Sequence, residues 1–257
     1  MDRQEAVLRE LNLYPLWKRR GEPASAEAQA QQSAEEPAVE AAVVPAVGEV
    51  AEPARAVAAE KGTGREQHIA TLDWPELKTM VRDCTACKLR AGCTQTVFGV
   101  GDEQADWLFV GEGPGAEEDE RGQPFVGKAG KLLDRMLAAG GLTDRVFITN
   151  TVFWRPPGNR TPTPQEQAVC LPFLERAFAL IQPKAVLLLG AAAAKSVLQT
   201  DEGIMRMRGQ WREWRLAEGG VSAPALPTLH PAFLLRQPQA KAQAWADILS
   251  LAARLDA

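Results

Sequence analysis

The sequence predicts an α/β fold in which helices cover both faces of a parallel sheet. Four short apolar runs of strand type alternate with segments whose apolar residues recur at helical spacing, a pattern typical of such sheets. The strand-like runs are residues 107–110, 146–150, 185–189 and 225–229. The helical segments are residues 73–83, 128–142, 164–181, 191–198 and 240–255. Each strand-like run ends at or beside a glycine or a polar residue that could contact a ligand, so we expect ligand-binding residues along one edge of the sheet.

Length and composition restrict the class of protein. The chain has 257 residues, is 46% hydrophobic and carries a net charge of −4. It therefore lacks the overall basic charge common in small nucleic-acid-binding domains, although a local basic groove is compatible with this balance. No run is long and apolar enough to cross a membrane, and the first residues lack the order of a signal peptide. We expect a soluble cytoplasmic protein whose cysteines are thiols or metal ligands rather than disulfides.

Composition divides the chain into three parts. Residues 1–20 have the apolar spacing of a short N-terminal helix. Residues 21–68 are rich in Ala, Glu and Pro, bury too little surface to fold, and are expected to form a disordered linker. The main domain is expected to occupy residues 69–257. The N-terminal helix either folds back onto this domain or docks on a protein partner.

The turn after the first strand-like run is rich in glycine and acid. Residues 111–130 read GEGPGAEEDERGQPFVGKAG and lead into a helical segment. Glycines let the backbone approach a ligand closely, while a phosphate-binding loop would favour bare amides and a lysine. The turn therefore predicts a pocket for a neutral group, or for one that becomes positive during a reaction.

Three further side chains are candidates for this pocket. The Asn150 amide suits the Watson–Crick edge of a base, or a simple cap. His230, held between a strand end and Pro231, can donate to a developing anion, or can lie in the core. Phe125 can stack on a planar ligand, or can be a core residue.

Two basic segments are candidates for contact with DNA. Residues 154–164 form a proline-stiffened loop with Arg155 and Arg160, whose guanidinium groups can bind phosphates. A second strip interleaves arginines with tryptophans over residues 206–214 and can add to that surface, or can be a solvated hairpin.

The number and spacing of the cysteines are compatible with a metal site. Cys84 and Cys87 form a C-x2-C pair, and Cys93 and Cys170 are the other two cysteines. Four thiolates can hold an iron–sulfur cluster or zinc, or the residues are free thiols.

In order and spacing together, these motifs resemble the type-four uracil-DNA glycosylases, a branch of the uracil-DNA glycosylase superfamily, over about residues 84–255. The resemblance rests on residues 111–119, 124–127, 148–150, 155–160 and 230–236. It implies a three-layer α/β/α sandwich with a central four-stranded parallel sheet. It also implies a repair enzyme that flips uracil out of DNA, hydrolyses its N-glycosidic bond and leaves an abasic site.

The resemblance assigns roles in the pocket. Glu112 and Gly113 would line the uracil site, Phe125 would stack on the base, and Asn150 would read its edge. His230 would stabilise negative charge on the departing base.

The remaining assignments concern the sugar and the DNA. Glu118 would stabilise the sugar cation or position water. Arg155, Arg160, Leu234 and Arg236 would contact DNA, and the Leu234-Leu235-Arg236 segment would lie in or near the gap that the flipped nucleotide leaves.

One position departs from the family pattern. The family carries a cluster cysteine immediately before the Arg-Pro-Pro motif, where this chain has Trp154. Cys84, Cys87 and Cys170 match the other three ligands of a [4Fe-4S] cluster. Either Cys93 supplies the fourth ligand, or the cluster is lost. The loop also lacks the histidine with which a related branch captures its product, so stable covalent capture is not expected.

Two alternatives stay open at the level of sequence. One is a glycosylase of the same fold for another deaminated base, such as hypoxanthine. The other is a DNA-binding accessory protein of replication, with residues 11–17 as a docking peptide. For the leading reading, the expected partner is uracil-containing DNA, single- or double-stranded, bound by a monomer.

Overall fold

The computed structural model describes residues 64–143, 145–216 and 220–254. The expected N-terminal helix and the linker up to residue 63 lie outside the described residues. Helix α2 (Gly64–Thr71) begins before the expected domain start, so residues 64–68 are helical and belong to the domain.

The sheet has six strands in the order β1-β3-β2-β4-β6-β5. They are β1 (Gly99–Gly101), β2 (Trp107–Gly111), β3 (Val146–Asn150), β4 (Ala185–Leu189), β5 (Arg212–Arg215) and β6 (Ser222–Thr228). The four inner strands are parallel, as expected, and β1 and β5 add antiparallel edges. The expected four-stranded sheet is therefore the centre of a wider one.

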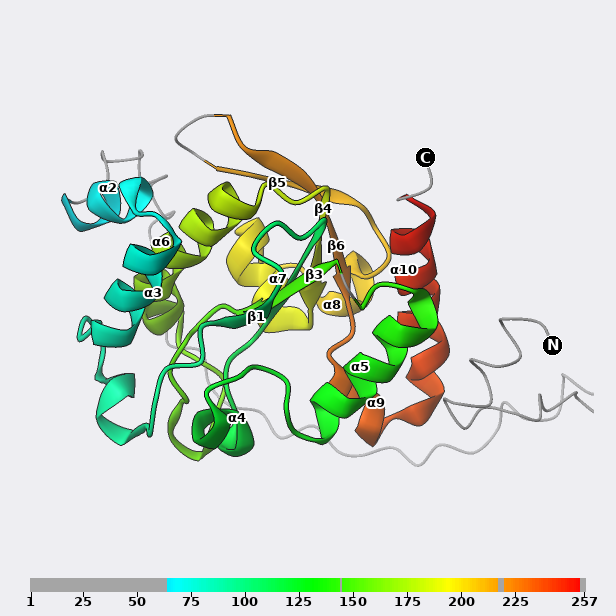
Figure 1. The fold of residues 1–257 in the computed structure, drawn as a ribbon. Helices are drawn as coiled ribbons and strands as arrows, with labels where there is room; N and C mark the ends of the chain where they lie inside the picture. Colours follow the sequence, from blue (N-terminus) through cyan, green and yellow to red (C-terminus); the bar gives the residue numbers. More distant parts are fainter. Residues whose placement is uncertain (1–63, 144, 217–219, 255–257) are drawn as a thin grey trace, which may run out of the picture. The chain divides into compact units, whose positions relative to one another are not determined.

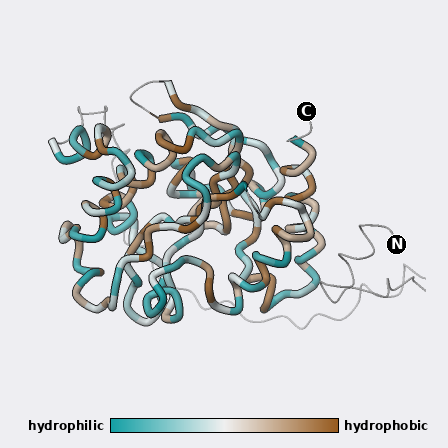
Figure 2. Tube along the Cα trace, viewed as in Figure 1, coloured by the Kyte–Doolittle hydropathy of each residue, from teal (hydrophilic) through white to brown (hydrophobic). Residues whose placement is uncertain are grey.

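Helices cover both faces of the sheet, which confirms the three-layer expectation (Figure 1). One layer contains α3 (Trp74–Asp83), α6 (Pro164–Ile181) and α7 (Ala191–Leu198), and the other α5 (Lys128–Gly140) and α10 (Lys241–Ala253). Successive residues of a strand face opposite sides, so Leu108 and Val110 of β2 join the α6 side of the core with Phe173. Figure 2 shows hydrophobic segments along the central strands and hydrophilic ones at the outer turns. None of the described helices is long and apolar enough to span a membrane.

Short helices follow the ends of two parallel strands and were not expected. They are α4 (Ala116–Arg121) after β2 and α9 (Pro231–Arg236) after β6. The other short elements are α8 (Ile204–Met207), η1 (Lys88–Gly92), η2 (Pro157–Asn159) and η3 (Pro238–Ala240). Helices α4 and α9 place side chains at the carboxyl edge of the sheet, where open α/β sheets bind ligands.

A buried polar network ties α10 to the end of β6. Asp247 of α10 accepts from the Thr228 hydroxyl at 2.6 Å and from the Arg208 guanidinium at 2.5 Å. Arg208 also donates to the Gln243 carbonyl at 2.7 Å. Burial raises the pKa of Asp247, while its two hydrogen bonds act in the opposite direction. Thr228 lies two residues before His230, so this network holds the strand end that carries the histidine.

The second basic strip is largely occupied within the protein. Arg208 is bound to Asp247 as described above, and Arg212 forms an ion pair with Glu202 at 3.0 Å. Trp214 is buried and stacks on Phe178 with ring centroids 4.1 Å apart. These contacts hold Arg208, Arg212 and Trp214 within the protein, which favours the hairpin alternative over a DNA-binding strip.

Candidate active site

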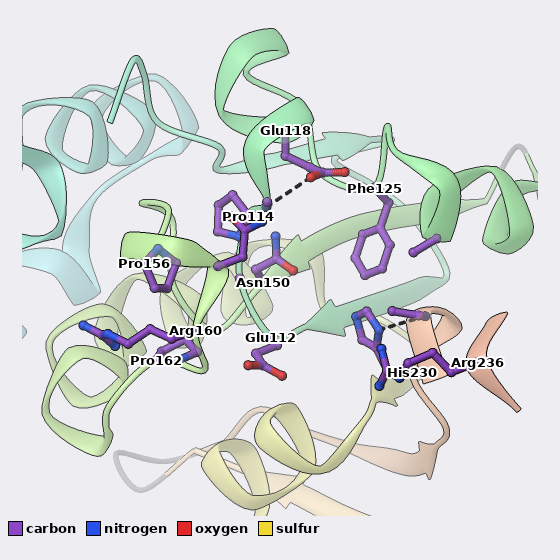
Figure 3. Close-up of a pocket in the computed structure, with 15 residues that line it drawn as sticks. Glu112, Pro114, Glu118, Phe125, Asn150, Pro156, Arg160, Pro162, His230 and Arg236 are labelled. Carbon is purple, nitrogen blue, oxygen red and sulfur yellow. Dashed lines mark hydrogen bonds between the residues drawn. The ribbon is translucent and has the colours of Figure 1, made fainter. Parts of the chain in front are cut away.

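A pocket of about 350 Å³ lies at the carboxyl edge of the sheet. It brings together six residues predicted to bind the substrate or to act in catalysis, which lie at or after the ends of β2, β3 and β6 (Figure 3). These are Glu112, Gly113, Glu118, Phe125, Asn150 and His230. Arg160 and Arg236 also line it, as does Pro114 of the turn after β2 that was expected to form the pocket. Pro156 and Pro162 line it as well, and sequence reasoning missed their contribution. The proline-rich loop that follows Asn150 in the sequence could have indicated that Pro156 and Pro162 lie at the pocket.

The base of the pocket depends on a glycine. Gly111 and Asn150 are paired across β2 and β3, and Asn150 is only 2% exposed. A methyl group at position 111 would overlap the Asn150 amide oxygen and lie 2.6 Å from Cζ of Phe125. Because real Cβ atoms do not approach other atoms this closely, only glycine leaves room for both side chains.

Phe125 is held in a conformation that non-glycine residues seldom adopt. Its φ is 56°, in the left-handed region, which costs a bulky residue conformational energy. A side chain at Gly130 would overlap the Phe125 carbonyl, so that glycine makes the conformation possible. The ring projects into the pocket beside His230 (Figure 3).

His230 is the N-cap of α9, and its ring orientation is fixed by that helix. Its Nδ1 accepts a hydrogen bond from the Ala232 backbone N–H at 3.1 Å. Burial lowers the pKa of His230 to about 4; the positive charge of Arg236 acts in the same direction, and Glu118 opposes it. The ring is therefore neutral near pH 7. Since Nδ1 is an acceptor, the proton lies on Nε2, which is the donor available to a ligand.

Glu118 joins two segments of the pocket wall. Its Oε2 accepts from the Gly115 backbone N–H at 3.1 Å. Its Oε1 accepts from the backbone N–H groups of Val126 and Gly127 at 3.0 and 2.9 Å. One carboxylate thus fixes both the start of α4 and the segment that carries Phe125.

Glu112 has a different environment. Its backbone carbonyl accepts from the Thr151 hydroxyl at 2.6 Å, which fixes the turn after β2. Its carboxylate makes no hydrogen bond to another described residue and is drawn in Figure 3 on the other side of Asn150 from Glu118. The pocket therefore has one carboxylate engaged by the backbone and one without such a partner.

The arginines of the proline-rich loop are both engaged with neighbours. Arg160 donates to both carboxylate oxygens of Glu166, at 2.8 and 2.7 Å. This hydrogen bonding, more than any other cause, lowers the pKa of Glu166 to about 2. Arg155 donates through Nε to the Asn159 side chain at 2.6 Å and does not line the pocket. Both guanidinium groups keep further N–H donors for other partners.

The structure corrects one predicted DNA contact. Leu234 has no exposed surface, because α9 turns it into the core, whereas Leu235 is 44% exposed. A side chain without exposed surface cannot contact DNA, so the assignment of Leu234 was wrong. Arg236, the next residue, is exposed and lines the pocket.

The four cysteines lie near one another in the fold but do not form a recognisable metal site. Cys84 ends α3, Cys87 and Cys93 flank η1, and Cys170 lies in α6. Within the described residues, no group of three or more His, Cys, Asp or Glu side chains is arranged to hold a metal ion. Burial raises the pKa of the Cys170 thiol to about 12. The buried indole of Trp154 occupies the sequence position at which the family carries its fourth cysteine, so the family's set of four ligands is incomplete in this chain.

Comparison with known proteins agrees with the geometry. The family model of the uracil DNA glycosylase superfamily matches residues 98–249, more than half of the chain. The chain belongs to this superfamily. The match spans β1 through most of α10 and includes every residue that lines the pocket.

Curated relatives narrow the branch of this superfamily. The type-4 uracil-DNA glycosylase of Thermotoga maritima is 44% identical over 158 residues, which cover 61% of this chain and 80% of the relative. That of Pyrobaculum aerophilum is 36% identical over 182 residues, covering 69% and 92%. A DNA polymerase of Bacillus phage SP01 is 30% identical over 143 residues, but these cover only 15% of that polymerase. The resemblance read from the sequence motifs is thus confirmed.

Proposed function

We infer that this chain is a uracil-DNA glycosylase, a hydrolase that removes uracil from DNA and leaves an abasic site for repair. The observation that carries this conclusion is the convergence of Asn150, Phe125 and His230 in one pocket. Together they offer an amide for a base edge, a ring for its face and a neutral donor for its negative charge. Uracil stacked in a duplex is out of reach of such a pocket, so the nucleotide must be flipped out.

We propose that Asn150 and Phe125 recognise the base. The Asn150 amide offers both an acceptor and donors, which match the alternating N–H and carbonyl groups of uracil. Its burial supports this role, because a buried amide that binds one base pattern leaves unpaired polar groups with another base. The Phe125 ring supplies a stacking surface, a contact worth about 1–3 kcal/mol per base.

We propose that His230 stabilises the leaving group. In the hydrolysis, the bond between C1′ and N1 breaks and its electron pair leaves with uracil. Water forms the new bond to C1′, and the proton it loses balances the proton that uracil takes up. The neutral His230 ring donates its Nε2–H to the developing anion, which is electrostatic stabilisation rather than acid catalysis.

We propose that the carboxylates act on the sugar side. Breaking the N-glycosidic bond builds positive charge on the sugar, which nearby negative charge stabilises. Glu118 is the candidate for this role or for positioning water, and its three backbone hydrogen bonds keep the carboxylate in one place. Glu112 is assigned to binding of the substrate.

We propose that the rim of the pocket contacts the DNA. Arg155, Arg160 and Arg236 can bind phosphates, which positions a duplex without reading its sequence. Leu235, rather than Leu234, is the exposed apolar side chain available near the gap. We also propose that the enzyme acts as a monomer on single- or double-stranded DNA; a partner for residues 1–20 stays a prediction.

A base-release assay tests this function. Oligonucleotides with U:G, U:A, single-stranded U or a hypoxanthine pair are incubated with the full chain and treated with alkali, and free base is measured in parallel. We expect cleavage at uracil and release of uracil. Asn150→Ala should lose selectivity, and His230→Ala should slow cleavage by about 10²–10³-fold with DNA binding retained. Cleavage of none of the substrates would reject the enzyme, and cleavage of hypoxanthine alone would favour the alternative base.

A further inference from the structure

We propose that Trp154 replaces an iron–sulfur cluster in this chain, and that the domain folds and acts without iron. The inference is independent of the choice of base. A [4Fe-4S] cluster bound by cysteines would join three segments: the 84–93 segment, the loop at residue 154 and helix α6. In this chain, protein contacts alone join the same three segments.

The indole of Trp154 takes a buried place among the residues that would surround the cluster. Trp154 is 5% exposed and belongs to the same hydrophobic cluster as Cys170 and Phe173. The guanidinium of Arg90, in η1, lies over its ring at 5.5 Å from the centroid. An indole has only an N–H donor and offers iron no ligand. The large apolar ring therefore fills the space in this hydrophobic cluster and also attaches the loop to η1.

The Cys93 thiol is engaged by two backbone carbonyls of the protein. Cys93 donates its S–H to the Leu89 carbonyl at 3.1 Å and to the Arg155 carbonyl at 3.3 Å. To serve as the fourth ligand, Cys93 would have to give up both bonds, one of which holds the residue next to Trp154. It therefore acts as a second link between the 84–93 segment and the loop.

Helix α2 supplies the link to α6. Arg65 donates to the sulfur of Cys84 at 3.7 Å and to the Val169 carbonyl at 3.1 Å. Its guanidinium also lies over the Phe173 ring, at 4.9 Å from the centroid. One arginine thus connects a cysteine of the C-x2-C pair to the helix that carries Cys170. Every connection that a cluster would make has a counterpart in Trp154, Cys93 or Arg65.

Metal content of the wild-type chain and of one variant tests the proposal. Both the full chain and Trp154→Cys are purified anaerobically and incubated with iron and sulfide, and iron, visible absorbance and Tm are measured. We expect the wild-type chain to stay colourless, with a Tm that a chelator does not change. Trp154→Cys completes the set of four cysteines and should gain about four irons per chain and a brown colour. Trp154→Phe, which keeps an aromatic ring but adds no thiol, is the matched control and should take up no iron.

Two results would overturn the proposal. The first is stoichiometric iron in the wild-type chain that disappears in Cys84→Ser; its loss in Cys93→Ser as well would identify Cys93 as the fourth ligand. The second is a Trp154→Cys variant with wild-type circular dichroism that still takes up no iron. Since the readout is metal content, neither result depends on whether the chain excises uracil.

Discussion

The rings of Phe125 and His230 lie side by side, with centroids 5.6 Å apart and planes inclined at 32°. Besides its proposed stacking on the base, the Phe125 ring packs beside the imidazole and contributes to its burial. Burial is the main cause of the low pKa of His230, so the two residues are linked through the protonation state of the histidine.

Phe125→Ala should change the pH dependence of base release. On the proposed role of His230, the neutral imidazole is the active form, and wild-type activity should fall only as the pH drops through the histidine pKa of about 4. Without the ring, water reaches the imidazole and its pKa rises toward the usual value of about 6.5, so activity should fall at a higher pH. Single-turnover rates between pH 4 and 8 measure this shift. Phe125→Tyr keeps a ring and should keep the wild-type profile; an unshifted profile in Phe125→Ala would contradict the link.

Gly111→Ala should reduce activity without unfolding the domain. The added methyl group would displace the Asn150 amide and the Phe125 ring, and a displacement of about 1 Å in a reacting site costs roughly 10²-fold in rate. The control is Gly203→Ala, because a side chain there meets nothing within 4 Å. The measurement is kcat/KM on uracil-containing DNA, with circular dichroism to check the fold. Equal activity of the two variants would refute the proposed role of Gly111.

Glu118→Gln and Glu112→Gln should differ in stability. A glutamine at 118 turns one of its oxygens into an N–H donor that faces backbone N–H groups, which costs about 1–3 kcal/mol. The Glu112 carboxylate has no such partners among the described residues, so its variant should keep the wild-type Tm and raise KM. Thermal unfolding and steady-state kinetics on both variants separate the effects. If Glu118→Gln retained the wild-type Tm, the three backbone hydrogen bonds would not stabilise the pocket wall.

Leu234→Ala and Leu235→Ala should act on different properties, although the residues are neighbours. Leu234 is fully buried, and its truncation should lower the free energy of unfolding by about 2–5 kcal/mol. Leu235 is exposed, and its truncation should change stability by less than about 0.5 kcal/mol. Leu235→Ala should instead slow excision from duplexes more than from single strands. Urea unfolding measures stability, and excision rates on duplex and single-stranded substrates measure the effect on DNA. Loss of duplex activity only in Leu234→Ala would assign the DNA contact to Leu234 instead of Leu235.

The sequence was sufficient to predict the inner sheet, because four buried strands alternate with long amphipathic helices. It did not reveal β1 and β5. The first is Gly-Val-Gly, and in the second Trp214 is the single buried residue, so both owe their pairing to neighbours that are distant in sequence. Short helices such as α9 span too few residues for helical spacing to be recognised. That is why the expectation for Leu234 was wrong.

Much of the candidate pocket was predictable, because its strands end in distinctive groups and the turn after β2 is rich in glycine and acid, although Pro156 and Pro162 were missed. What the sequence could not reveal is how these groups are held. The left-handed backbone of Phe125 depends on the close approach of Gly130, and the orientation of Glu118 depends on backbone amides of two segments. Such relationships exist only in three dimensions.

The hydrogen bond between Thr228 and Asp247 links α10 to the position of His230. Helix α10 contributes no residue to the pocket, yet it restrains the strand end from which His230 projects. Parts of a folded domain open and close locally, below the free energy of global unfolding. Each opening of α10 would release that restraint, so the working lifetime of the site depends on how often α10 detaches rather than on when the whole domain unfolds.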